Sequence, residues 1–140
     1  MKIASFIICF ILVLQTSAMA ADYAGQISAY RRAHGLSFVK IDSRLHAAAL
    51  RQARAMASSG TISHTVGGSF SSRVAGLRKS RAAENIAAGF RTFAETLQQW
   101  KDSPGHRENL LMEGAHKVGV ASVSNPSSPY RVFWARVITD

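Results

Sequence analysis

The chain has almost no cysteine. Of its 140 residues only Cys9 is a cysteine, and it lies in an apolar run near the N-terminus. A domain of this size buries about two-thirds of its chain surface on folding, and small exported domains often add disulfide bonds for that reason. A disulfide framework is excluded here, so the fold must depend on packing alone. We find no internal repeat and no linker, and therefore expect one folded domain.

Acidic residues are also scarce, with 8 Asp and Glu against 17 Lys and Arg and a formal net charge of +9. A basic balance of this kind favours anionic partners such as lipid headgroups, cell-envelope polymers or nucleic acid. The one noticeable basic cluster has no interleaved aromatic residues of the kind that stack on bases; it comprises Arg73, Arg78, Lys79 and Arg81. We therefore expect a lipid or an anionic cell-envelope polymer as partner, and no nucleic acid; a solvated basic surface without such a partner is the alternative interpretation.

No apolar run is long enough to span a bilayer. The longest, Ile3 to Leu14, has 12 residues, whereas a spanning helix needs roughly 20. Lys2 precedes this run and Ala18-Met19-Ala20 follows it, which is the pattern of a cleaved secretory signal peptide. We predict that residues 1–20 are a signal peptide and that residues 22–140 form the domain, with an uncleaved N-terminal anchor as the alternative interpretation of the apolar run. The protein is then secreted or periplasmic, and its membrane association is at most peripheral.

Apolar periodicity and capping signals predict four helices, over residues 24–33, from residue 42 to residue 60, from residue 92 onward, and over residues 103–111. Thr92 and Glu95 have the spacing of a capping box. Pro104 directly follows Ser103, as a proline in the first helical position follows its N-cap. Residues 61–72 are rich in Ser, Thr and Gly and are predicted to be a loop, followed by a short helical piece over residues 72–77.

Branched and aromatic residues dominate the C-terminal part of the chain. Residues 118–123 and 130–138 have the composition of strands, and Asn125 to Pro129 between them has that of a turn. The two segments are therefore predicted to form an antiparallel hairpin. Trp100 and Trp134 are expected in the hydrophobic core.

Two histidines and a glutamate could contribute to a metal or acid–base site. His64 lies in a polar loop, where an exposed residue without a role is the alternative interpretation. His106 lies in the first turn of a predicted helix, whose positive end favours the neutral imidazole that a metal ligand or a base requires. Glu84 lies in the otherwise apolar stretch 82–89, where a buried carboxylate needs hydrogen-bond partners. An exposed loop carboxylate is the alternative for Glu84.

Four segments occur in a specific order along the chain: His64, Ala83-Glu84-Asn85-Ile86-Ala87, Trp100 followed by Ser103-Pro104-Gly105-His106-Arg107, and Val118-Gly119-Val120. Together they resemble the bacterial branch of the CAP superfamily, whose relatives include cysteine-rich secretory proteins, venom antigens and plant pathogenesis-related proteins. The resemblance runs from about Tyr23 to the C-terminus. It implies an α+β fold, a three-layer α-β-α sandwich around a central, largely antiparallel sheet, with a cleft on one side.

The resemblance also implies a cleft tetrad of two histidines and two glutamates, which in this chain are His64, Glu84, Glu95 and His106. Glu95 has a structural explanation as well, because the capping box alone accounts for a glutamate there. In some members of the family the two histidines bind zinc or another divalent cation. Zinc or another divalent cation is therefore the expected cofactor, with His64 and His106 as its ligands and no organic cofactor.

The chain departs from the eukaryotic pattern of the superfamily in two respects. It has no disulfides, and Ser-Pro-Gly-His-Arg stands around His106 in place of a Gly-His-Tyr-Thr-Gln-like segment. The sterol-binding and signalling roles of eukaryotic members are therefore not carried over.

Three functions are weighed in order. The first is a secreted binding module whose His/Glu cleft holds a divalent metal and a lipid or cell-envelope ligand. The second is a metal- or glutamate-assisted hydrolase of peptidase type, with Glu84 and Glu95 as its catalytic residues. The third is a structural envelope protein in which the tetrad is a stabilising polar network. The hydrolase lacks a dedicated nucleophile, since no cysteine remains after cleavage and no serine lies in a nucleophile elbow. We therefore rank the binding module first.

The signal-peptide pattern predicts that the exported protein begins at Ala21 and folds without Cys9. N-terminal sequencing of the exported protein should read from Ala21, and a thiol reductant should leave its Tm unchanged because no disulfide is present. Met1 at the N-terminus of the exported protein would contradict the prediction.

Overall fold

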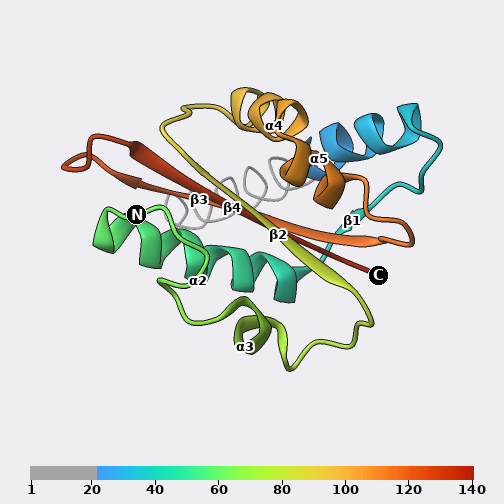
Figure 1. Ribbon diagram of the computed structural model, residues 1–140, viewed down its shortest axis with the longest axis horizontal. Helices are drawn as coiled ribbons and strands as arrows, with labels where there is room; N and C mark the ends of the chain where they lie inside the picture. The colour runs from blue at the N-terminus through green and yellow to red at the C-terminus, as the bar shows by residue number, and fades with distance from the viewer. Residues whose placement is uncertain (1–21) are drawn as a thin grey trace, which may run out of the picture.

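A four-stranded sheet lies between two layers of helices in the computed structural model, which describes residues 22–140 (Figure 1). The predicted signal peptide and its cleavage site lie outside the described residues. One layer contains α2 (Ser43–Ser59) and α3 (Phe70–Val74). The other contains a helix over residues 22–33 together with α4 (Phe93–Asp102) and α5 (Pro104–Leu110). The predicted three-layer α-β-α sandwich is confirmed.

The strands have the order β1-β3-β4-β2. The long hairpin of β3 (Lys117–Asn125) and β4 (Arg131–Thr139) is antiparallel, as predicted from its branched and aromatic residues. β2 (Ala82–Ala88) pairs antiparallel with β4, and the two-residue β1 (Lys40–Ile41) pairs parallel with β3. The sheet is therefore largely antiparallel, and β2 forms one of its edges.

α2 begins and ends where its capping residues predict. The Asp42 carboxylate accepts hydrogen bonds from the amides of Arg44 and Leu45, and Gly60 ends the helix with a φ of 65°. Alanines fill much of its buried face, which lets the helix lie close to β3 and β4. An alanine Cβ built at Gly119 of β3 would lie 2.1 Å from the backbone nitrogen of His46. The sheet and α2 are therefore in direct backbone contact at this point.

The layer on the opposite side of the sheet packs around Trp100, which is fully buried beside Phe93, and Phe93 also packs against Trp134. Thr92 and Glu95 form the predicted capping box at the start of α4. Pro104 occupies the first turn of α5, as predicted, although the Ser103 side chain makes no capping hydrogen bond. The prediction that both tryptophans belong to the core is confirmed.

Two short elements differ from the sequence prediction. The short helix after the Ser/Thr/Gly-rich loop covers Phe70–Val74 rather than residues 72–77. Residues 82–88, for which no secondary structure was predicted, form the edge strand β2. Alanine is a weak strand former, so this strand depends on pairing with β4 rather than on its own composition.

The close approach of α2 to β3 predicts that Gly119→Ala destabilises the protein by about 3 kcal/mol or more, because a methyl group would collide with helix backbone that cannot move aside. Urea unfolding followed by circular dichroism measures the change. Gly25→Ala is the matched control, since its Cβ would meet nothing within 4 Å in a helical segment, and it should stabilise slightly. Equal stability of the two variants would contradict the prediction.

Candidate functional site

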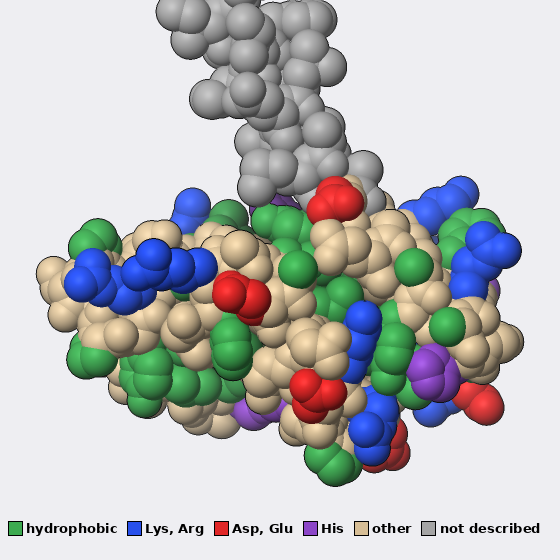
Figure 2. Space-filling model, turned by 90° about the horizontal axis from the view of Figure 1, so that it is seen from above, with side chains coloured by type: hydrophobic (Ala, Val, Ile, Leu, Met, Phe, Trp, Pro, Cys, Tyr) green, Lys and Arg blue, Asp and Glu red, His purple; other side chains and the backbone are tan. Residues whose placement is uncertain are grey.

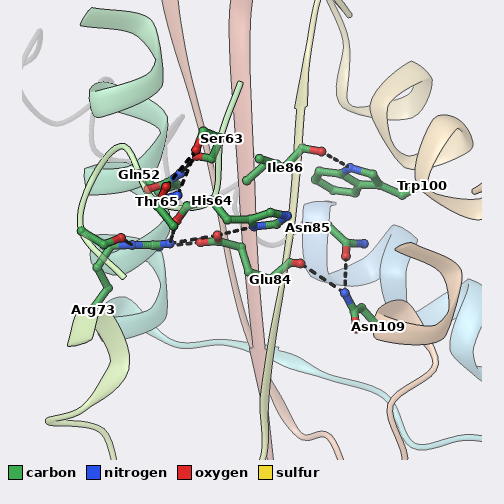
Figure 3. A network of polar contacts seen from close by, with 11 residues as sticks. Gln52, Ser63, His64, Thr65, Arg73, Glu84, Asn85, Ile86, Trp100 and Asn109 are labelled. Atoms are coloured by element: carbon green, nitrogen blue, oxygen red, sulfur yellow. Dashed lines mark hydrogen bonds and ion pairs between the residues drawn. The ribbon is translucent and has the colours of Figure 1, made fainter. Parts of the chain in front are cut away.

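The edge strand β2 connects the two layers, because its successive side chains point to opposite faces of the sheet. Glu84 points toward the layer of α2 and α3, and Asn85 points toward α5 (Figure 3). The polar residues around these two side chains form one continuous network on both sides of the strand. We call this network the β2-edge site.

Glu84 forms a buried ion pair with Arg73 of α3. Nη1 and Nη2 of Arg73 lie 2.5 Å and 2.9 Å from Oε2 and Oε1 of Glu84, a two-point contact between guanidinium and carboxylate. Both side chains are at most 3% exposed. The prediction that Glu84 is buried with polar partners is therefore confirmed. Arg73, which the sequence placed in a basic surface cluster, is the principal partner.

His64 contacts the same carboxylate from the loop before α3. Its Nδ1 lies 2.9 Å from Oε1 of Glu84, and because a carboxylate only accepts, Nδ1 carries the donated hydrogen. The Nε2 atom of a neutral ring is then left with a free lone pair. The imidazole is 51% exposed, so this lone pair is accessible from outside.

The loop that carries His64 is held by several further hydrogen bonds. Arg73 donates from Nη2 to the backbone oxygen of His64 and from Nε to that of Gly68. Gln52 of α2 donates to the backbone oxygen of Ser63. The loop is therefore fixed on both sides of His64 although its own sequence predicts no regular structure.

Asn85 and Asn109 join β2 to α5. Nδ2 of Asn85 donates to the backbone oxygen of His106 at 3.0 Å. Nδ2 of Asn109 donates to Oδ1 of Asn85 and to the backbone oxygen of Glu84, at 3.0 Å and 3.2 Å. Sequence reasoning gave these asparagines no role in the site. The only signal in the sequence was that Asn85 directly follows Glu84 and that Asn109 lies three residues after His106.

The free edge of β2 is covered by side-chain donors. Nε1 of Trp100 donates a hydrogen bond to the backbone oxygen of Ile86 at 3.1 Å. Nδ2 of Asn109 donates one to the backbone oxygen of Glu84. Unpaired edge carbonyls are a template for pairing with another strand, so these contacts protect the edge.

His106 lies on the α5 side of the network. Its Nδ1 is buried and has no hydrogen-bond partner among residues 22–140. Burial lowers the pKa of His106, and the charges of His64 and Arg136 lower it further. The imidazole is therefore neutral near neutral pH, and it lies within electrostatic reach of His64.

Arg136 of β4 is a second buried cation near the network. Its guanidinium lies 5.9 Å from the Trp100 ring centroid and has no hydrogen-bond partner within the described part of the chain. Burial lowers its pKa to about 9, the charge of Arg31 acts in the same direction, and the charge of Glu84 acts in the opposite one. Arg136 is thus still protonated at neutral pH and places positive charge close to His106.

Glu95 lies in the capping box at the start of α4. One carboxylate oxygen accepts hydrogen bonds from the amides of Arg91 and Thr92 and from the Thr92 hydroxyl. These hydrogen bonds lower the pKa of Glu95 although the carboxylate is exposed. Its hydrogen-bond partners are all neighbours in sequence. The structure therefore brings His64 and Glu84 into contact, places His106 near them, and accounts for Glu95 as a helix cap.

The hydrogen bonds of Glu84 limit which side chains of the site could coordinate a metal ion. Both carboxylate oxygens of Glu84 are engaged by Arg73 or His64, so Glu84 orients His64 rather than offering a free ligand oxygen. Within residues 22–140 no group of three or more His, Cys, Asp or Glu side chains is arranged to hold a metal ion. The available donors are two imidazoles.

The buried ion pair predicts a large cost for Glu84→Ala, about 3–5 kcal/mol of unfolding free energy, because Arg73 would be left buried and uncompensated. Urea unfolding measures the loss. A second variant, Arg73→Met with Glu84→Leu, should lose less than Glu84→Ala alone, because it removes both charges. A wild-type unfolding curve for Glu84→Ala would show that the pair does not form in solution.

Comparison with known proteins shows the family to which this chain is similar. The model of the Cysteine-rich secretory protein family, CAP, matches residues 25–137. The uncharacterised protein YkwD of Bacillus subtilis (strain 168) is 32% identical over 104 residues, which are 71% of this chain and 40% of that protein. The chain thus spans less than half the length of this relative.

Solved structures show the same fold. An outer surface protein of Borrelia burgdorferi superposes with a TM-score of 0.74 at 21% identity, over 84% of this chain and 88% of that one. An extracellular protein containing an SCP domain, from Bacillus anthracis str. Ames, superposes with a TM-score of 0.73 at 25% identity, over 84% of this chain and 39% of that one. With the family model matching most of its length, the chain belongs to the CAP family of cysteine-rich secretory proteins.

Proposed function

We propose that this protein is an extracellular binding module whose β2-edge site holds a divalent cation between His64 and His106. The extracellular location is supported by the signal-peptide pattern of residues 1–20 and by two structural relatives described as an outer surface protein and an extracellular protein. The observation that carries the metal proposal is the contact between Nδ1 of His64 and the Glu84 carboxylate.

That contact prepares His64 as a ligand. A carboxylate that accepts from one ring nitrogen fixes the tautomer and the orientation of the ring, and it raises the basicity of the other nitrogen. Arg73 in turn fixes the carboxylate through two hydrogen bonds. The Nε2 atom of His64 is then the coordinating atom, and its ring is half exposed, which leaves a route for a cation.

His106 fits the role of second ligand. Its buried Nδ1 has no partner among the described residues, and burial favours its neutral, coordinating form. Two imidazoles suit zinc better than magnesium or calcium, which prefer oxygen. With only two protein nitrogens the remaining positions would be filled by water or by a ligand. Affinity should therefore be modest compared with closed four-ligand sites.

The hydrogen bonds of Glu84 and Glu95 also favour a binding role over a hydrolase. A hydrolase of the kind considered from sequence needs a carboxylate free to accept a proton from water. Both oxygens of Glu84 are engaged by cationic or donating partners, and one oxygen of Glu95 is engaged in its helix cap. The engagement of the Glu84 carboxylate on both oxygens therefore supports a binding role over a general-base role for this residue.

The metal proposal predicts that zinc binds wild type, measured by calorimetry at about pH 7.5, and that binding weakens at about pH 5.5 because protonated imidazoles cannot coordinate. His64→Ala with His106→Ala should abolish the same signal. The matched control is His34→Ala with His116→Ala, which replaces two exposed histidines away from the site and should bind zinc as wild type does. Equal zinc uptake by the first double variant would refute the assignment.

A further inference from the structure

Charge is unevenly divided between the two helical layers. Residues 43–81, which contain α2, the His64 loop, α3 and the segment leading to β2, include seven Arg and Lys and no Asp or Glu. Within the described residues, only Arg73 among these cations is paired with a carboxylate, that of Glu84. The remaining six are Arg44, Arg51, Arg54, Arg78, Lys79 and Arg81, and all except the partly buried Lys79 are exposed. We call this layer the basic face.

The opposite layer has no such excess. Its helices and loops carry both signs of charge, with Asp22, Glu95, Asp102, Glu108 and Glu113 among its residues. Figure 2 shows this face, where acidic side chains lie among basic ones over the helical layer that contains α4. The positive potential is therefore concentrated on the side of the sheet that carries α2 and α3.

Two acids border the basic face, and each is engaged with backbone amides. Asp42 caps α2 through the amides of Arg44 and Leu45. The Asp140 carboxylate accepts from the Ser80 hydroxyl and from the amides of Arg81 and Ser80, and these contacts, the hydroxyl foremost, lower its pKa to about 2. Neither acid forms an ion pair with a side chain of the basic face.

Part of the basic face is hollowed. Arg44 and Arg78 line a hollow of about 180 Å³ together with Lys117 at the start of β3 and with Asp42, whose carboxylate is engaged in capping α2. From Arg44 the row of cations continues along α2 through Arg51 to Arg54. At 1.5 Å per residue this row extends about 15 Å along the helix. The hollow has three cations and one carboxylate that is already hydrogen-bonded to backbone amides, and a line of arginines follows it. This arrangement is suited to a chain of repeated anionic groups.

We propose that the basic face binds a linear polyanion with repeated phosphate groups, which seats one phosphate between Arg44, Arg78 and Lys117 and continues along α2. Guanidinium groups favour phosphate because they can donate two parallel hydrogen bonds to it. The proposal goes beyond the proposed metal site, because it names a second class of partner, a phosphate-bearing envelope polymer, on a different surface. It requires no metal.

Two features favour a phosphate polymer without bases over a lipid surface or single-stranded nucleic acid. A lipid surface usually also needs exposed apolar side chains to enter it, and Ile62 is the only exposed large hydrophobic residue of the basic face. Single-stranded nucleic acid usually stacks on aromatic residues, and Phe70, the only aromatic residue between residues 43 and 81, lies half-buried against Arg73.

The test uses long-chain inorganic polyphosphate as the probe, in the presence of a chelator, with binding followed by calorimetry. The variant carries Arg44→Gln, Arg54→Gln and Arg78→Gln, three exposed residues without side-chain hydrogen bonds among the described contacts. The matched control carries Arg32→Gln, Arg91→Gln and Arg107→Gln, which remove the same charge from the opposite layer. The single charge reversal Arg78→Glu, in a loop, serves as a second variant should the triple variant fold poorly.

We expect the basic-face variant to weaken polyphosphate binding at least about tenfold and to lower the log–log salt slope by about 2, while the control changes Kd less than about twofold. Equal losses in the two triple variants would overturn the proposal, because binding would then follow net charge alone. Tighter binding to phosphatidylglycerol vesicles or to oligothymidine than to polyphosphate would also overturn the choice of partner.

Failure of this proposal is distinguishable from failure of the metal proposal. The variant His64→Ala with His106→Ala should bind polyphosphate as wild type does, and the basic-face variant should still bind zinc. Loss of polyphosphate binding in the histidine variant would assign the polymer to the β2-edge site instead of the basic face.

Discussion

The buried pair of Arg73 and Glu84 is the contact on which the arrangement of the site depends. A guanidinium and a carboxylate withdrawn from water must satisfy each other and their remaining hydrogen-bond capacity, or the fold is strongly destabilised. Arg73 does so by reaching Glu84, the His64 backbone and the Gly68 backbone together. One side chain therefore fixes α3, the preceding loop and the edge strand relative to one another. The described domain has no cysteine, and this buried ion pair connects its segments where small secreted domains often use disulfides.

The site is also a product of strand geometry. An edge strand has one side free, and alternation sends neighbouring residues to different layers. Glu84 and Asn85 use this alternation to connect the layer of α2 and α3 with α5. Histidines from segments 42 residues apart in sequence thus come within electrostatic reach of each other (His64 and His106). The half-exposed position of His64 leaves the site open to solvent on the side of the basic face.

Much of this architecture could be read from the sequence. The caps of α2 and α4, the β3–β4 hairpin and the burial of both tryptophans follow from local signals, and the family resemblance supplied the three layers. β2 was missed because its alanines carry no strand preference and its pairing with β4 is non-local. The role of Arg73 was missed for a related reason. A serine-rich, basic stretch indicates an exposed surface, and only the tertiary fold brings one of its arginines to Glu84.

The position of β2 in the chain has a kinetic consequence. The β3–β4 hairpin forms from neighbouring segments. β2 is separated from β4 in the chain by α4, α5 and β3, so it can pair with β4 only after these three elements have been synthesised. Loop closure over a longer stretch costs more entropy and slows the contacts that depend on it. The hairpin and α2 can therefore condense into a partial core before the edge strand is added. An intermediate of this kind would expose unprotected β4 backbone and would lack the β2-edge site, so its lifetime sets how long the nascent domain is vulnerable to aggregation and proteolysis.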